Sequence, residues 1–230
     1  MRKKLILGLA TLVVLGLATA AYATVTGTYN ASFSPNKANK SAGVSVNYVL
    51  TSPPPAVQPP VNNRIQISFP TGGKWNGSKF PKCSASALLA KGPKGCPSKS
   101  KLGTGTGVGY AKPVVTDPVN AALTIFNGGN SILVYVFPDL GPTFVVTCKI
   151  AGGYNLDCTI PPIKTLPNAP DAATGTVKTK TKALSIKKGG KSVGLVLTPK
   201  KCKGSWKSTA KFTFTDGESL SLPFSQKCKK

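Results

Sequence analysis

The chain contains no histidine, and only six of its 230 residues are acidic. Histidine is the commonest general base, so Ser-His-Asp and Cys-His nucleophile systems are excluded. Only two of the acids, Asp216 and Glu218, are close in sequence, and the pattern around Gly217 is typical of a hairpin turn rather than a catalytic cleft. We therefore predict that the protein is not an enzyme and uses no cofactor.

Motifs that bind metals or nucleotides are also missing. There is no Cys-x-x-Cys pair, which together with the lack of histidine disfavours a metal site. Gly190-Lys191-Ser192 lacks the glycine that a Walker A loop needs at position 185. The segment Gly103–Gly109 has glycine at every second position, which is not the GxGxxG spacing of a dinucleotide site.

Residues 1–23 have the organisation of a secretory signal peptide. The basic start Arg2-Lys3-Lys4 precedes the apolar run Leu5–Ala20, and Ala21-Tyr22-Ala23 fits the cleavage rule. An uncleaved membrane anchor is the alternative interpretation. We expect a mature chain of residues 24–230 that is secreted or associated with the cell envelope, with no integral membrane span after cleavage.

Six cysteines behind such a leader predict three disulfides. Fifteen pairings are possible for six cysteines. The spacing favours the nearest neighbours in sequence, which gives Cys83–Cys96, Cys148–Cys158 and Cys202–Cys228. A three-residue loop at 152–154 would place the members of the second pair opposite each other.

Lysine dominates the charged residues. The chain has 30 basic residues and a net charge of +24, and without the three basic residues of the leader 27 basic and 6 acidic residues leave +21. Arg64 is the single arginine of the mature chain, and lysine lacks the planar fork that reads bases, so we expect no sequence-specific nucleic-acid binding.

The lysines allow two interpretations: a solvated coat, or a surface that binds polyanions such as anionic cell-wall polymers. The second interpretation predicts a patch made of Lys178, Lys180, Lys182, Lys187, Lys188, Lys191, Lys200, Lys201, Lys203, Lys227, Lys229 and Lys230. Charge reversal in this patch should weaken polyanion binding more than reversal at Lys37, Lys40 and Lys112.

Three aromatic residues, Trp75, Trp206 and Tyr110, are candidates for stacking on glycans, although core anchoring is the ordinary role of such rings and the favoured interpretation. Two functions therefore stay open. One is a structural or adhesive protein of the envelope, and the other is a binding module for glycans or anionic polymers. Buried tryptophans with evenly scattered lysines would favour the first.

Alternating apolar residues and many Gly and Pro predict an all-β antiparallel sandwich of about 11–13 strands, as one domain or two closely packed sheet pairs. The clearest predicted strands are residues 24–34, 44–50, 64–69, 101–111, 121–126, 132–137, 143–150, 154–160, 176–184, 193–197, 207–215 and 218–224. The Thr-Lys alternation of 176–184 is typical of an edge strand. Asp216-Gly217 predicts a type I′ hairpin.

One short helix is expected between Cys83 and Cys96. Ser84 can cap a helix over Ala85–Lys91, and Gly92 ends it. Leu88 and Leu89 should anchor this turn to the core. In the strand that follows, glycines 103, 105, 107 and 109 share one face, which suits close packing under an aromatic ring or, alternatively, a platform for a ligand.

Several strings together resemble a group of uncharacterised secreted proteins of actinobacteria. They are Phe80-Pro81-Lys82-Cys83, Cys96-Pro97 to Gly105, Phe126-Asn127-Gly128, Thr198-Pro199-Lys200-Lys201-Cys202, Trp206, Phe214-Thr215-Asp216-Gly217 and Cys228. The resemblance implies an exported, disulfide-bearing, Ig-like β-sandwich in or outside a bacterial envelope. It implies no catalytic residues.

Overall fold

The computed structural model describes residues 25–54, 56, 58–166 and 168–230, so the expected signal peptide lies outside the described residues. Within them, eleven strands form one sheet: β1 (Thr26–Ser34), β2 (Gly43–Thr51), β3 (Asn62–Ser68), β5 (Lys101–Tyr110), β6 (Val119–Asn127), β7 (Ser131–Pro138), β8 (Phe144–Ala151), β9 (Asn155–Thr159), β10 (Ala173–Thr181), β14 (Ser205–Phe214) and β15 (Ser219–Lys227). Two small sheets pair β11 (Ser185–Lys188) with β12 (Lys191–Gly194) and β13 (Val196–Leu197) with β4 (Lys74–Trp75). The helical segments are α1 (Ala85–Lys91), η1 (Gly77–Lys79), η2 (Gly92–Gly95) and η3 (Ser98–Ser100).

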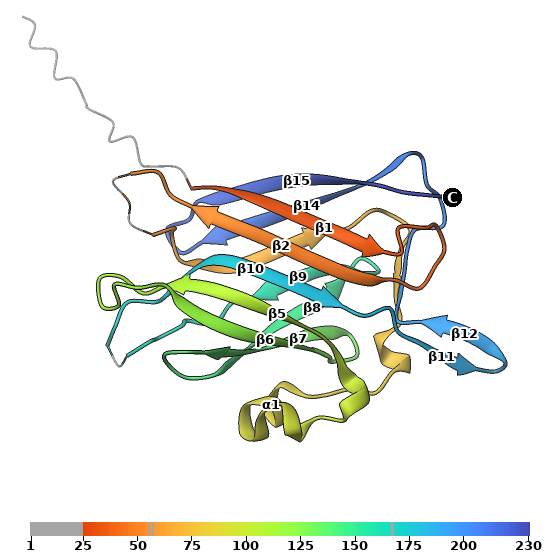
Figure 1. Cartoon of the computed structure of the whole chain (residues 1–230), viewed down its shortest axis with the longest axis horizontal. Helices are drawn as coiled ribbons and strands as arrows, with labels where there is room; N and C mark the ends of the chain where they lie inside the picture. Colours follow the sequence, from red (N-terminus) through yellow and green to blue (C-terminus); the bar gives the residue numbers. More distant parts are fainter. Residues whose placement is uncertain (1–24, 55, 57, 167) are drawn as a thin grey trace, which may run out of the picture.

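The main sheet has the strand order β1-β2-β10-β5-β6-β7-β8-β9-β3-β14-β15, and its paired strands are antiparallel. It folds over on itself, because the ring of Tyr48 in β2 lies 5.0 Å from that of Phe212 in β14, a strand far away in the sheet order. Figure 1 shows β1 and β2 overlapping β14 and β15 in one part of the molecule, with β5 to β7 in the other. The predicted antiparallel β-sandwich is confirmed. Its two layers are halves of one continuous sheet, whereas an immunoglobulin domain has two separate sheets.

The two edge strands of this sheet lie beside each other. The Gln226 side chain of β15 donates from Nε2 to the carbonyl of Phe33 in β1 at 2.9 Å and accepts from the Phe33 amide at 2.8 Å. Beyond the strand ends, Lys37 and Lys229 form a parallel bridge. The side-chain amide of Gln226 thus bonds to both backbone groups of Phe33 on the side of β1 that has no strand partner in the sheet.

Strand β14 illustrates why these residues form strands. Its buried positions alternate with exposed or half-buried ones, and the buried residues are Trp206, Ser208, Ala210, Phe212 and Phe214. Alternate side chains of a strand point to opposite faces, so this pattern buries one face and leaves the other in solvent. Strand β7 differs, because Leu133 and Tyr135 on its outer face are covered by the segment around α1.

Helix α1 forms as predicted, with Ser84 Oγ accepting from the Ala87 amide at 3.1 Å. Gly92 ends it with a φ of 61°, a left-handed value that suits glycine. The prediction that two leucines anchor the helix was half wrong. Leu88 is completely buried, whereas Leu89 is 57 % exposed, because neighbouring helical positions point about 100° apart.

The three predicted disulfides are confirmed: Cys83–Cys96, Cys148–Cys158 and Cys202–Cys228. The second joins directly paired residues of β8 and β9, which are connected by the predicted loop 152–154. The first brackets α1 and η2 on the outside of the sheet.

Strand β10 corrects the prediction of an edge strand, because it pairs with both β2 and β5. Its lysines 178 and 180 are exposed on the outer face, and the alternating Thr179 and Thr181 face inward. Thr179 Oγ1 donates to the Val46 carbonyl at 2.7 Å, and Thr181 Oγ1 donates to that of Val44 at 3.1 Å. The Thr-Lys alternation therefore reflects an inner and an outer face of an internal strand.

Two smaller predictions were also wrong. Residues 193–197 form no single core strand, since they are divided between β12 and β13. The β14–β15 hairpin exists, but of its two central residues only Gly217 has a positive φ, 90°, so the turn is not type I′. Asp216 instead accepts the Glu218 amide on its side chain at 3.0 Å, which stabilises the turn locally.

Three hydrophobic clusters stabilise the fold. The first fills the space between β1, β2, β3, β14 and β15 with aromatic rings, among them Tyr29, Tyr48, Phe212 and Phe214. The second lies at the end of the molecule that carries the C-terminus and includes Phe33, Phe80, Leu195 and Trp206. The third packs Cys83 and Leu88 against the outer face of the sheet.

Replacing the two leucines of α1 separately tests this packing. Leu88→Ala should lower the free energy of unfolding by about 2–5 kcal/mol, because it leaves a cavity under the helix. Leu89→Ala should change it by less than about 0.5 kcal/mol, because that side chain is mainly in solvent. Urea denaturation of the oxidised protein measures both, and equal losses would contradict the helix orientation.

Candidate ligand-binding cavity and basic surface

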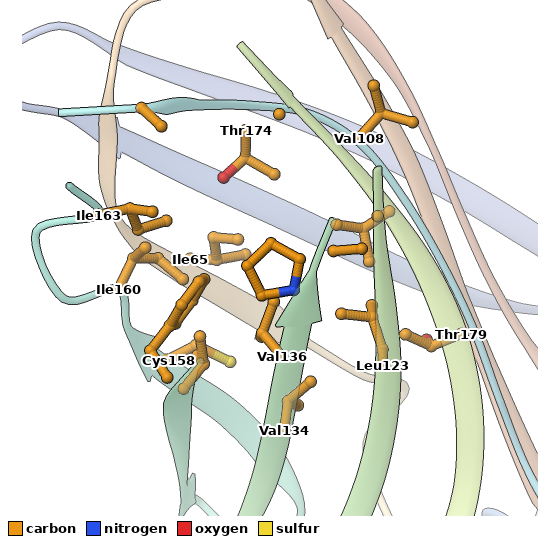
Figure 2. Close-up of a pocket in the computed structure, with 18 of the residues that line it drawn as sticks. Ile65, Val108, Leu123, Val134, Val136, Cys158, Ile160, Ile163, Thr174 and Thr179 are labelled. Carbon is orange, nitrogen blue, oxygen red and sulfur yellow. The ribbon is translucent and has the colours of Figure 1, made fainter. Parts of the chain in front are cut away.

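An apolar cavity of about 210 Å³ lies inside the folded sheet, and the first cluster borders it through residues such as Tyr48, Ile65 and Ile67. Its walls come from β2, β3 and the consecutive strands β5 to β10. Figure 2 shows Ile65 of β3, Leu123 of β6, and Val134 and Val136 of β7 around this space. The Cys148–Cys158 disulfide is also part of the wall.

The cavity exists because the inward residues here are small or aliphatic. Ala121, Val134, Val146 and Val177 line it, and all four keep partial exposure although they point into the sandwich. Protein interiors are normally packed without voids larger than a water molecule. The aromatic rings that fill the neighbouring half are nearly absent from this lining.

The glycine face of β5 forms one wall. Gly107 pairs with Ala121 on β6 and Val177 on β10, and a Cβ at this glycine would meet no atom nearer than 3.8 Å. Gly103 and Gly105 differ, since a Cβ on either would collide with a backbone carbonyl of β10. The predicted close approach on this face is thus made by a neighbouring strand, not by an aromatic ring, and the rest of the face borders the cavity.

The cavity has a closed end and an open end. Ile125 and Ile132 belong both to its lining and to the cluster around Trp206, which closes one end. At the other end Leu140, Pro142 and Lys164 line the cavity and are exposed. We call this end the mouth; it is surrounded by the β5–β6, β7–β8 and β9–β10 loops, whose described residues are 111–118, 139–143, 160–166 and 168–172.

Each of the three loops carries one exposed large apolar side chain. Val114, Leu140 and Leu166 are between 41 % and 45 % exposed, and Leu140 also lines the cavity. Lys164 Nζ lies 3.0 Å from Asp171 Oδ1 and donates to the Ala169 carbonyl at 2.9 Å.

Thr165 adds a buried hydroxyl to this group. It lines the cavity, is only 7 % exposed, and its hydroxyl has no hydrogen-bond partner among the described residues.

The mouth is also where acidic residues gather. Its three loops contain Asp117, Asp139 and Asp171 but only two lysines, Lys112 and Lys164, so they carry a net charge of −1 in a chain of net charge +24. The ion pair of Lys164 with Asp171 neutralises two of these charges. The mouth is therefore close to neutral although the protein is strongly basic.

Every lysine of the predicted patch is exposed. Three links join the segments around residues 37–40, 199–202 and 228–230 near the C-terminus. They are the Cys202–Cys228 disulfide, the bridge between Lys37 and Lys229, and the bond from the Asn39 amide to the Pro199 carbonyl at 3.0 Å. Figure 1 places this region and the β11–β12 hairpin opposite the β5–β6 and β9–β10 loops. Lys37 and Lys40 were expected to lie outside the patch. The structure corrects this, because their loop lies beside Lys229 and Pro199 at the end of the molecule that carries the patch.

The three candidate stacking residues form no common exposed surface. Trp206 is 4 % exposed, its ring packs edge-on against Phe33, and its Nε1 donates to the Lys201 carbonyl at 3.1 Å. Trp75 is half-buried and donates to the Gly129 carbonyl at 2.6 Å. Tyr110 is half-buried, with its ring against Gly175. The predicted stacking role is wrong for Trp206, whose ring is buried in the core, and Trp75 packs against the same cluster.

Arg64 pairs with Asp157 through two bonds of 2.8 and 2.6 Å, which lowers the pKa of that carboxyl below its usual value. Its guanidinium is thus already occupied by a carboxylate. Across the described part of the chain, no three side chains of His, Cys, Asp or Glu are grouped as metal ligands would be. None of the described helices has the length and apolar character needed to cross a bilayer.

The sequence did not predict the cavity. Its one signal was the glycine alternation, which indicated a smooth face but not what would lie against it. Comparison of the chain with protein-family models, curated proteins and solved structures gives no match. The resemblance to secreted actinobacterial proteins therefore stays a prediction.

Alanine substitutions along β5 test the two kinds of glycine. Gly105→Ala should destabilise the protein by about 1–3 kcal/mol, since the methyl group meets the β10 backbone. Gly107→Ala should be neutral or stabilising by up to about 1 kcal/mol, because the new methyl group makes ordinary contacts, none nearer than 3.8 Å, and restricts the unfolded chain. Thermal and urea unfolding measure the difference, and equal effects would rule out the open space beside Gly107.

Proposed function

We propose that the protein is an exported, non-enzymatic binding protein that holds an apolar small molecule in the cavity between its sheet halves. The observation that carries this proposal is the unfilled, apolar interior with an open mouth. Three disulfides support export, because such bonds persist in oxidising compartments. Association with a bacterial envelope is the setting that the sequence resemblance suggests.

The size of the cavity fits a small ligand. An engineered cavity of about 150 Å³ lined by aliphatic and aromatic residues stays dry and binds benzene. At the same cavity volume per carbon atom, the cavity here has room for roughly eight or nine carbon atoms. Apolar surface that moves from water into such a site gains about 25 cal/mol per Å².

The lining favours binding over catalysis. Among the described residues that line the cavity, Lys164 is the only one charged at neutral pH, and it is paired with Asp171. Burial raises the pKa of Tyr48, so its hydroxyl stays protonated. The wall thus offers no pair of groups for acid–base chemistry. A purely structural or adhesive role, the first expectation from the sequence, gives no reason to keep the interior unfilled.

Binding of propylbenzene, a neutral molecule of suitable size, tests the proposal. Isothermal titration should detect saturable binding, and Ala121→Leu, which extends into the cavity, should weaken it at least tenfold. Ala122→Leu is the matched control, because Ala122 is the next residue on β6 and is exposed. Circular dichroism checks that both variants fold. Absence of binding, or equal affinities in the two folded variants, would refute the proposal.

A second function, binding of anionic polymers, is favoured by the gathering of lysines around the C-terminus. Lys229 lies at the bridge to Lys37, and Lys200 follows Pro199, which bonds to the same loop. Such binding depends on counterion release and should weaken steeply with salt. The patch is opposite the mouth, so a polymer and an apolar ligand should bind together.

Paired charge reversals test the polymer site on a heparin column. Lys200→Glu with Lys229→Glu should elute at clearly lower salt than Lys91→Glu with Lys94→Glu, a control with the same net charge near α1. Saturating heparin should leave the affinity for propylbenzene unchanged. Equal elution of the double variants would show that the lysines act only as a solubilising coat.

A further inference from the structure

The large apolar side chains that the protein exposes are concentrated at the mouth. Among the described residues, five of them are between 41 % and 58 % exposed: Leu89, Val114, Phe137, Leu140 and Leu166. Val114, Leu140 and Leu166 come from the three loops of the mouth, and Phe137 is the second-last residue of β7, which leads into one of these loops. Leu89 is on α1, on the outside of the sheet (Figure 1). Single apolar residues are normal on a surface, whereas a group at one end indicates a contact surface.

The three loops present these side chains to solvent because they are rich in proline. Their described residues include Pro113, Pro118, Pro142, Pro161, Pro162 and Pro170. Proline fixes its own φ and restricts the residue before it, so such loops have few conformations that would fold their apolar side chains back onto the sheet. Val114 and Leu166 are not among the described residues that line the cavity, so ligand contact inside it does not account for their exposure.

The cavity that opens between these loops indicates what the side chains contact. Leu140 belongs both to the exposed rim and to the lining, so apolar surface continues from the loops into the cavity. Molecules that suit such a cavity leave water and collect in lipid, because the transfer of apolar surface out of water is favourable. A bilayer surface therefore supplies the ligand and accommodates the rim side chains, whereas a protein partner would cover the opening.

The charges at this end favour an apolar contact over an electrostatic one. The three loops carry a net charge of −1, and Lys164 is paired with Asp171. Anionic headgroups would repel Asp117 and Asp139, and the lysines that they would attract gather at the opposite end of the molecule. Contact of the mouth with lipid therefore depends on inserted apolar side chains, and added salt does not screen such a contact.

The predicted leader joins the described structure at the same end. It ends at residue 23, close to the first described residue, Val25. Thr26 at the start of β1 pairs with Thr51 at the end of β2, and that end of β2 lies beside the start of β10, which follows a loop of the mouth. A leader that enters the membrane during export would therefore bring the mouth toward that membrane.

We propose that the mouth docks on a lipid bilayer, with Val114, Leu140 and Leu166 inserted among the headgroups. In this orientation the cavity opens toward the membrane and exchanges its apolar ligand with lipid. The exchange rests on the proposed function of the cavity, while the docking itself rests on the exposed side chains of the three loops.

Co-sedimentation of the full mature protein with phosphatidylcholine vesicles, which have no net charge, tests the docking. The protein should bind, and its affinity should change less than about twofold between roughly 0.1 and 0.5 M salt. Val114→Ser combined with Leu166→Ser should weaken binding at least about tenfold, since two half-exposed apolar side chains no longer leave water. The affinity for propylbenzene should stay unchanged in this double variant, because neither residue lines the cavity.

Leu89→Ser is the matched control for Leu166→Ser. It removes a leucine that is 57 % exposed, against 45 % for Leu166, so a general effect of surface hydrophobicity would make it the more damaging change. We expect Leu89→Ser to bind vesicles normally and Leu166→Ser to bind them more weakly. Circular dichroism checks that both variants fold.

Tryptophan reporters at the same two positions check the orientation of the docked protein. Leu166→Trp should give a blue-shifted emission that brominated phosphatidylcholine quenches, because its ring lies at the lipid interface. Leu89→Trp should give neither signal. The unsubstituted protein supplies the background emission of Trp75 and Trp206.

Several results would overturn the docking: no vesicle binding, binding that salt abolishes, equal weakening by Leu89→Ser and Leu166→Ser, or quenching of the reporter on α1. A dimer in sedimentation that the Val114→Ser, Leu166→Ser double variant loses, with vesicle binding unchanged, would assign the surface to a second copy of the chain. If propylbenzene binds and vesicles do not, the docking fails and the proposed function stands. If vesicles bind and propylbenzene does not, the proposed function fails and the lipid contact stands.

Discussion

The two edges of the eleven-stranded sheet lie side by side, and the rest of the interior depends on this contact. Gln226 reaches from β15 to both backbone groups of Phe33 on β1, the rings of Tyr29 and Phe224 pack edge to face, and backbone bonds join the loop after β1 to Lys229. An open sheet of this length would leave two unpaired edges, which invite association with other chains. Joining the edges also encloses an interior, and the cavity depends on that enclosure.

The interior is filled unevenly, and this difference separates the stabilising part of the molecule from the candidate binding part. Rings such as Phe212 and Phe214 are buried in one half, and Tyr48 lies between them and the cavity, which it lines. In the other half Gly107 faces Ala121, and aliphatic side chains reach only part of the way across. The disulfide between Cys148 and Cys158 lies in the wall between these regions, where it joins two strands that border the cavity.

Charge is distributed along the same axis as the cavity. The loops of the mouth are nearly neutral, while the exposed lysines gather around the C-terminus at the other end. Because salt screens the electric field of each charge within about 8 Å, the lysines at one end do not make the mouth at the other end electropositive. An apolar ligand and an anionic polymer would therefore approach the molecule from opposite directions, and neither site obstructs the other.

Local patterns in the sequence determined the strands, the capped helix at Ser84 and all three disulfides, because alternation, capping and short cysteine spacing act between residues close in the chain. Tertiary structure alone decided that β10 is internal, that Leu89 is exposed and that Lys37 lies beside Lys229. It also decided that the glycines of β5 border a cavity. A face made of glycines shows that side chains are absent there, but it does not show whether a strand, an aromatic ring or a cavity lies next to that face. That outcome depends on partners such as Ala121 and Val177, which only the strand order brings opposite Gly107.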